Sequence, residues 1–424
     1  MVDIVHKRLL RLLRSSEQYT KTDMVYLMKG SFWLTLSQII GTLTSVATSI
    51  AFANLLPEET YGMFRYVLAV VPILAIPTLT GVDAALTRTI AQGNDGAVHP
   101  ALAMKMRWGS LGALAAGILA AYYYTQGDQG LALLFLITAT CIPFMDPFNL
   151  FVAYFTGKQA FALRTYYGAL ARIIPTIVLV SVVFFTKSIY VLVGAYFLSY
   201  TLTRYVGLRA ALRTTRSTKS GHGEALSLGK HLSFMNILNT VSASLDSILI
   251  FHFGGAAALA GYYLATVPEA QISSAFANLN TLALPKFALQ DATTLRSTLP
   301  RKALHTYYVI IPILAVYFIT APWFFSVFYP KYTDYVFLSD LFMLRMAFFP
   351  TGFFTTAFTA LNERTKLYIS TITYSSSRII LLLIFTPLYG LWGAVAAILA
   401  ASVIVSIVKT CLFFTLETPV RAAA

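Results

Sequence analysis

Six ionisable side chains lie inside long apolar stretches of the sequence. They are Arg65, Asp146, Asp246, Glu269, Arg345 and Arg378. A charge at membrane depth costs about 3 kcal/mol or more, so such residues usually face a helix-bundle interior or a wet cavity. Arginine binds phosphate through a planar fork of donors, whereas a carboxylate can carry a proton or a cation. The pattern therefore indicates residues that line a helix-bundle interior or a wet cavity, with the carboxylates as candidate proton carriers.

Three of these residues lie deep in apolar stretches, and each has a structural alternative. Arg378 could hold a diphosphate, or could form an ion pair with a carboxylate on another helix. Asp246 and Glu269 are the best candidates for ion or proton coupling, yet both could simply neutralise arginines. The sequence leaves these alternatives open.

The other three lie nearer span ends or beside prolines. Arg65 and Arg345 are further candidates for diphosphate binding, but both could extend toward the outer surface, with Asp340 as a structural partner for Arg345. Asp146 stands between two prolines, where a helix bends and backbone carbonyls are released. We expect it to be a structural or cavity charge.

Composition indicates the class of protein. The chain has 424 residues, of which 57% are hydrophobic and 11% are charged, whereas soluble proteins are about 25% charged. At about 20 apolar residues per span, this supports twelve membrane-spanning helices. We therefore predict an all-α polytopic membrane protein. The net charge of +14 does not indicate nucleic acid, because the basic residues interrupt hydrophobic runs instead of gathering on one surface.

The expected spans follow from apolar stretches of sufficient length. They cover residues 30–54, 62–81, 108–125, 131–155, 168–185, 189–209, 231–253, 261–285, 304–327, 336–360, 368–385 and 391–416.

Lysine and arginine fix the expected orientation. On the face that holds the N-terminus, 26 of the 31 such residues lie in connections or within a turn or two of the membrane surface, and only Lys187 and Lys331 lie on the opposite face, with the other three inside spans. Because basic loops stay cytoplasmic, both termini should be cytoplasmic. We expect an amphipathic basic N-terminal segment, a linker between two six-helix lobes, and a short cytoplasmic tail. Their bounds are 1–29 for the segment, 30–209 and 231–416 for the lobes, 210–230 for the linker and 417–424 for the tail.

Signatures of catalysis are missing from the sequence. No GxxxxGK[ST] phosphate loop occurs, the six histidines form no HExxH pattern, and the two cysteines lie far apart. Acidic residues are too sparse in the longer inner connections for a metal-dependent sugar transferase. We expect no enzyme, no catalytic residue, no metal site and no cofactor.

Several short motifs resemble the polysaccharide translocases, the lipid-linked oligosaccharide (O-antigen type) flippases of the multidrug/oligosaccharidyl-lipid/polysaccharide export superfamily. LLPEETYG at residues 55–62 lies between the first two spans, and GVDAALTR at 81–88 follows the second. Glycine and basic residues follow spans four and ten, at 157–158 and 362–364. Their order and the twelve-span count, taken together, carry the resemblance across nearly the whole chain.

The resemblance implies a fold and a function. It implies two six-helix lobes around a central cavity that opens to each face in turn. It also implies a bacterial inner-membrane flippase that moves undecaprenyl-diphosphate-linked oligosaccharide to the periplasmic leaflet, driven by membrane potential, an ion gradient or both. Membrane lipids, a polysaccharide polymerase and a chain-length regulator are the expected partners. The alternative is a proton- or sodium-coupled exporter of drugs or small metabolites.

Overall fold

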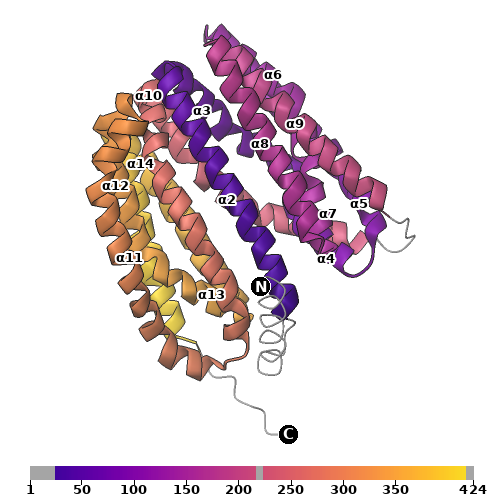
Figure 1. Cartoon of the computed structure of the whole chain (residues 1–424), viewed down its shortest axis with the longest axis vertical. Helices are drawn as coiled ribbons and strands as arrows, with labels where there is room; N and C mark the ends of the chain where they lie inside the picture. The colour runs from indigo at the N-terminus through magenta and orange to yellow at the C-terminus, as the bar shows by residue number, and fades with distance from the viewer. Residues whose placement is uncertain (1–23, 216–222, 417–424) are drawn as a thin grey trace, which may run out of the picture. The chain divides into compact units, whose positions relative to one another are not determined.

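The computed structural model describes residues 24–215 and 223–416. Every regular element in these ranges is a helix (Figure 1). The expected amphipathic segment around residues 5–14, part of the linker and the tail 417–424 lie outside the described residues. The described chain forms two compact units, which we consider separately. Unit 1 combines the residues up to Ala47 with Pro77–Ser181 and Val193–Phe234, and unit 2 combines Thr48–Ile76, Val182–Leu192 and the residues from Met235 onward. The lobe boundaries at 30–209 and 231–416 stay a prediction.

Unit 1 is built from helices that run from indigo to magenta in Figure 1. They are the first part of α2 (Met24–Leu55), α4 (Gly81–Ala91), α5 (Val98–Thr125), α6 (Gln129–Met145), α7 (Leu150–Gly157), α8 (Phe161–Phe185) and α9 (Ile189–Thr214). A turn with Gly127 at a φ of 84° joins α5 to α6, and Asp128 begins α6 by accepting a hydrogen bond from the Leu131 amide at 2.8 Å. The helices α5 and α6 therefore form a helical hairpin.

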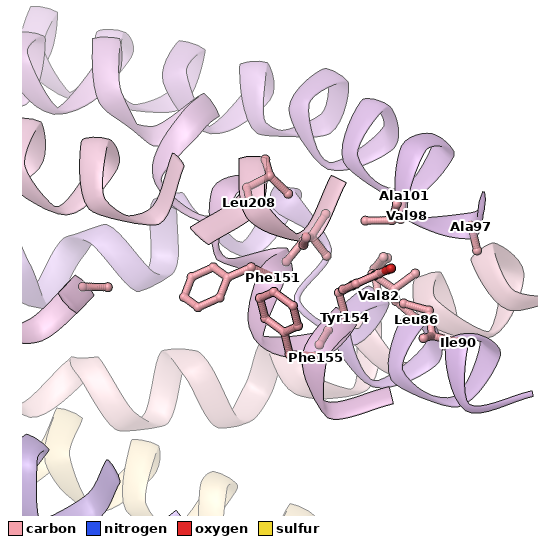
Figure 2. Close-up of a cluster of buried hydrophobic side chains, with 14 residues drawn as sticks. Val82, Leu86, Ile90, Ala97, Val98, Ala101, Phe151, Tyr154, Phe155 and Leu208 are labelled. Carbon is pink, nitrogen blue, oxygen red and sulfur yellow. The ribbon is translucent and has the colours of Figure 1, made fainter. Parts of the chain in front are cut away.

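The buried core of unit 1 lies where α4, α5, α7 and α9 meet. Figure 2 shows Phe151, Tyr154 and Phe155 of α7 among aliphatic side chains from the other helices. Gly157 allows α7 to approach α4, because a Cβ there would lie 2.7 Å from the Thr87 carbonyl oxygen. This core fixes the relative positions of these four helices.

Unit 2 holds the end of α2 and α3 (Glu58–Leu74), together with most of α10 (Gly223–Ala288), α11 (Ala292–Phe328), α12 (Val336–Met343), α13 (Gly352–Ala360) and α14 (Arg364–Phe414). The helices α11, α12 and α14 pack together in orange and yellow in Figure 1. Both α10 and α14 contain a sharp break, at Gly255 (φ 84°) and at Gly390 (φ 57°). Only glycine adopts these angles without strain, so each long helix divides into two spans.

The helical segments agree with the expected spans. Seven helices of the described chain are long and apolar enough to cross a membrane, or eight if the bent pair Glu58–Leu74 and Ile76–Ala91 is one span. Two of the seven, α10 and α14, each cover two expected spans. The prediction of an all-α polytopic membrane protein is confirmed, and the number twelve is consistent with these helices.

Interruptions occur at related places in the two halves of the sequence. In the fourth expected span, a 3-10 turn (η3, Pro147–Asn149) separates α6 from α7 directly after Asp146. In the tenth, a 3-10 segment (η5, Leu344–Thr351) separates α12 from α13 and carries Arg345. Pro268, by contrast, lies within α10 without interrupting it. Each half thus places a charged residue at a break in its fourth span.

Gly62 in α3 makes the closest backbone approach in unit 2. A Cβ on Gly62 would lie 1.7 Å from the carbonyl oxygen of Ala256, next to the break in α10. We expect Gly62→Ala to lower the stability of the protein by about 1–3 kcal/mol, because backbone atoms must move apart. Thermal unfolding in detergent measures this. Gly117→Ala is the matched control, since nothing lies within 4 Å of a Cβ there, and an equal loss in both variants would contradict the packing argument.

Candidate functional site

A cavity of about 440 Å³ lies within unit 2, among α10, η5, α13 and α14. Its charged lining residues are Glu269, Arg345 and Lys409, and most of its other polar lining residues are hydroxyl-bearing serines and threonines. A polar cavity surrounded by spanning helices is the usual form of a transport site. This cavity is therefore the candidate functional site.

Arg345 and Glu269 form an ion pair at the cavity. The Arg345 Nη1 donates to Glu269 Oε2 at 3.3 Å, and the Ser273 hydroxyl donates to the other carboxylate oxygen at 2.8 Å. The Arg345 side chain is 29% exposed whereas that of Glu269 is 9% exposed, so the arginine is the more accessible partner. Its unusual accessibility follows from its position in η5, where the regular helix is interrupted.

Lys409 gives the cavity an excess of positive charge. Within the described ranges it forms no ion pair with a carboxylate, and Glu269 is the only acid that lines the cavity. The Thr355 hydroxyl also lines the cavity and is buried without a hydrogen-bond partner in the described chain. With all groups ionised, two cations and one carboxylate face the cavity, together with a hydroxyl that can donate. This combination suits an anion.

A second ion pair joins α10 to α14 near the cavity. Arg378 Nη2 lies 2.9 Å from Asp246 Oδ2, which also accepts a hydrogen bond from the Tyr262 hydroxyl at 2.5 Å. The side chains of Arg378 and Asp246 are 12% and 9% exposed. Arg378 also contacts the hydroxyl of Tyr374, a cavity residue, at 3.5 Å. The guanidinium of Arg378 is thus already bound by Asp246 and Tyr374.

Arg65 lies elsewhere in unit 2 and does not line the cavity. Its guanidinium sits 3.2 Å from the centre of the Tyr263 ring, and Nη2 donates to the buried Tyr61 hydroxyl at 3.3 Å. Such cation–aromatic contacts stabilise by about 2 kcal/mol when water is excluded. These contacts tie α3 to the second part of α10.

Asp146 lies in unit 1 as part of a triad around a buried lysine. The ammonium of Lys105, 0% exposed, lies 2.7 Å from Asp83 Oδ1 and 2.9 Å from Asp146 Oδ2. The Thr78 hydroxyl donates to Asp146 at 2.5 Å. The triad connects α4, α5 and the break between α6 and α7, so its arrangement is structural.

Comparison with known proteins identifies the family. The model of a family described as polysaccharide biosynthesis proteins matches residues 27–288. The chain belongs to the polysaccharide biosynthesis protein family. This confirms the resemblance found in the sequence. None of the curated proteins compared with the chain matches it.

Solved structures of transporters share the fold of this family member. An inward-facing multidrug resistance transporter of the MATE family is 17% identical, with a TM-score of 0.61 over 91% of this chain and 97% of that one. The lipid II flippase MurJ is 15% identical, with a TM-score of 0.61 over 92% and 88%. A transporter of the MOP superfamily from Pyrococcus furiosus is 16% identical, with a TM-score of 0.62 over 92% and 94%. At these identities the matches show the fold.

The expected site residues of this polysaccharide biosynthesis family member fall into separate groups. Glu269 and Arg345 lie together at the cavity, Asp246 and Arg378 form a neighbouring pair, and Arg65 lies apart from both. In the structure, Arg378, Asp246 and Glu269 each form an ion pair, which is the structural alternative named for them in the sequence analysis. Arg345 pairs with Glu269 and not with Asp340, whose Oδ1 is buried without a hydrogen-bond partner in the described chain.

Two basic residues inside helices, Lys409 and Arg172, are not among the site residues predicted from the sequence. Lys409 lies within the last expected span but was counted with the cytoplasmic tail, and it lines the cavity. Arg172 was counted with an inner loop, yet α8 begins at Phe161 and places Arg172 near its middle. Both lie more than one turn inside their helices, which distinguishes them from basic residues of the connections.

Proposed function

We propose that this protein is a flippase that moves undecaprenyl-diphosphate-linked oligosaccharide from the cytoplasmic to the periplasmic leaflet by alternating access. The observation that carries the proposal is the cavity of unit 2, with its excess of positive charge, in a member of the polysaccharide biosynthesis family. A diphosphate needs cationic partners away from bulk water, and Arg345 and Lys409 supply them. The bacterial inner membrane, with both termini cytoplasmic, is the proposed location, and a polysaccharide polymerase and a chain-length regulator are proposed partners.

The ion pair at the cavity suggests how coupling to protons would operate. After the diphosphate has left at the outer face, a proton taken up there by Glu269 would remove its charge, and release of that proton in the cytoplasm, once the empty carrier has returned, would restore the ion pair with Arg345. Membrane potential adds a second driving force, because two negative charges moving outward gain about 4.6 kcal/mol per 100 mV. We retain Asp246 as a second coupling candidate, and Arg65 and Arg378 as diphosphate ligands that must first leave Tyr263 and Asp246.

Coupling through these carboxylates predicts a loss of pH dependence. In proteoliposomes with a labelled lipid-linked oligosaccharide, we expect translocation by the wild type to rise when a proton gradient is imposed. Glu269→Gln should abolish that rise, because its amide cannot take up a proton, and Asp246→Asn should reduce it. If both variants respond to the gradient as the wild type does, proton coupling through these residues is wrong.

Translocation itself is tested in the same proteoliposomes without a gradient. The wild type should move the labelled glycan to the opposite leaflet faster than empty liposomes do. If the glycan stays where it was added while a cationic dye is exported, the drug-exporter alternative replaces the flippase.

A further inference from the structure

Two arginines on α8 form a second cationic site, in unit 1. Arg172 lies near the middle of this 25-residue helix, about 16 Å along the axis from its first residue, and Arg164 lies about two turns closer to that end. A hydrocarbon core is about 30 Å thick, so Arg172 sits at a depth that neither surface reaches easily. A role for it must therefore be found inside the membrane.

Both arginines lie on the protein-facing side of α8. At 100° per residue they fall in the same sector as the buried Ala171 and Leu179. The opposite sector carries the exposed residues typical of a lipid-facing surface, Leu163, Ile173, Ile174 and Ile177. Arg172 is nevertheless exposed, and a charged side chain that is exposed on an interior face borders a wet space.

The helix α2 positions the Arg172 guanidinium. Nη1 donates to the Ser37 carbonyl oxygen at 3.0 Å, and a Cβ on Gly41 would lie only 1.9 Å from this nitrogen. The two helices are held in register by the hydrogen bond from Thr165 to the Trp33 carbonyl at 2.9 Å. The guanidinium thus occupies room that only glycine at position 41 leaves, with donors remaining for a ligand.

No carboxylate neutralises this pair in the described parts of the chain. Neither arginine comes within 4.0 Å of an acid there, and the two guanidiniums are close enough to repel each other. Arg172 lies within the expected span and Arg164 lies just before it, so a positive charge inside the membrane has a like charge beside it and needs an anion for stability. We propose that Arg164 and Arg172 bind the phosphate or diphosphate of a polyprenyl carrier lipid. This inference rests on the proposed function and adds, in unit 1, a second site for the carrier's head group besides the cavity of unit 2.

Binding to the purified full-length protein in nanodiscs tests the site. The probes are undecaprenyl diphosphate, inorganic diphosphate and phosphatidylglycerol, and binding is followed by ligand-induced thermal stabilisation. We expect Arg172→Gln and Arg164→Gln to lower the affinity for undecaprenyl diphosphate at least tenfold. Arg172→Lys should lower it less, because lysine keeps the positive charge but lacks the two-pronged donor geometry of the guanidinium. Arg213→Gln, an exposed arginine in the last turn of α9, is the matched control and should bind normally.

A second variant separates binding from folding. Gly41→Ala keeps every charge but displaces the guanidinium, so it should also weaken binding. Unchanged affinity in both Arg172→Gln and Gly41→Ala overturns the site. If phosphatidylglycerol stabilises the protein as much as undecaprenyl diphosphate does, through Arg172, the site binds phospholipids in general. If inorganic diphosphate does so, the site binds a free anion. Either result overturns a site for the carrier lipid.

The inference can fail independently of the proposed function. If the wild type translocates lipid-linked oligosaccharide but these variants bind the carrier normally, only the site on α8 is wrong. If the wild type translocates nothing yet binds undecaprenyl diphosphate through Arg172, the function is wrong and the site stands.

Discussion

Replacing Lys105 with methionine is expected to destabilise the protein by about 2–3 kcal/mol, less than the loss of one partner from a fully buried ion pair, because the side chains of Asp83 and Asp146 are 35% and 25% exposed. Its ammonium is fully buried between the carboxylates of Asp83 and Asp146. Methionine fills the space but leaves two negative charges 2.7 and 2.9 Å from where the cation was. Thermal unfolding in detergent, with yield of monodisperse protein, measures the loss.

A charge-free triad provides the control. The combined variant Lys105→Met, Asp83→Asn and Asp146→Asn removes the repulsion, so it should recover most of the lost stability, as neutral replacements of buried ion pairs often do. If Lys105→Met is as stable as the wild type, the triad does not hold unit 1 together. If the combined variant is no better than the single one, packing and not charge explains the loss.

Removing both cations of the cavity is expected to have the largest effect on transport. A hydrogen bond to a charged group contributes about 1.5–3 kcal/mol, so Arg345→Gln and Lys409→Gln should each slow translocation by about ten- to a hundredfold. Loss of Arg345 also leaves Glu269 unpaired, which adds negative charge to the cavity. The rate of glycan translocation in proteoliposomes measures both.

The variants need controls for charge and for folding. Adding Glu269→Gln to Arg345→Gln restores the cavity's wild-type net charge of +1, so the remaining defect reports the lost contact with diphosphate. Arg213→Gln changes the net charge equally at an exposed position and should transport normally. Normal rates in the Arg345 and Lys409 variants would show that this cavity does not hold the head group.

Much of the fold could be predicted from hydrophobicity alone. Apolar stretches long enough for a membrane located the helices because burying the backbone in lipid requires helical hydrogen bonding. The break beside Asp146 was also foreseeable, since two prolines flank it. The breaks in α10 and α14, at Gly255 and Gly390, fall in the expected connections 254–260 and 386–390, so the bounds of the apolar stretches located them as well.

The candidate site was less predictable, because pairing depends on which helices are neighbours. Charged residues inside apolar stretches can be identified from the sequence. Their partners cannot, because Arg345 pairs with Glu269 and not with Asp340 through the packing of helices that are distant in sequence. Lys105 lies before the expected span 108–125 because α5 begins earlier, at Val98, whereas Arg172 and Lys409 lie inside the expected spans 168–185 and 391–416 but close enough to their cytoplasmic ends to resemble loop residues. Basic residues at helix ends and inside spans look alike in sequence.

The sidedness of lipid-linked oligosaccharide in cells tests the central claim most directly. Cells lacking this protein would be complemented with the wild type or with Arg345→Gln, and a membrane-impermeant probe would label only outward-facing glycan. The flippase account predicts that labelled glycan disappears without the protein, returns with the wild type and stays low with Arg345→Gln. Unchanged labelling in cells that lack the protein would contradict it.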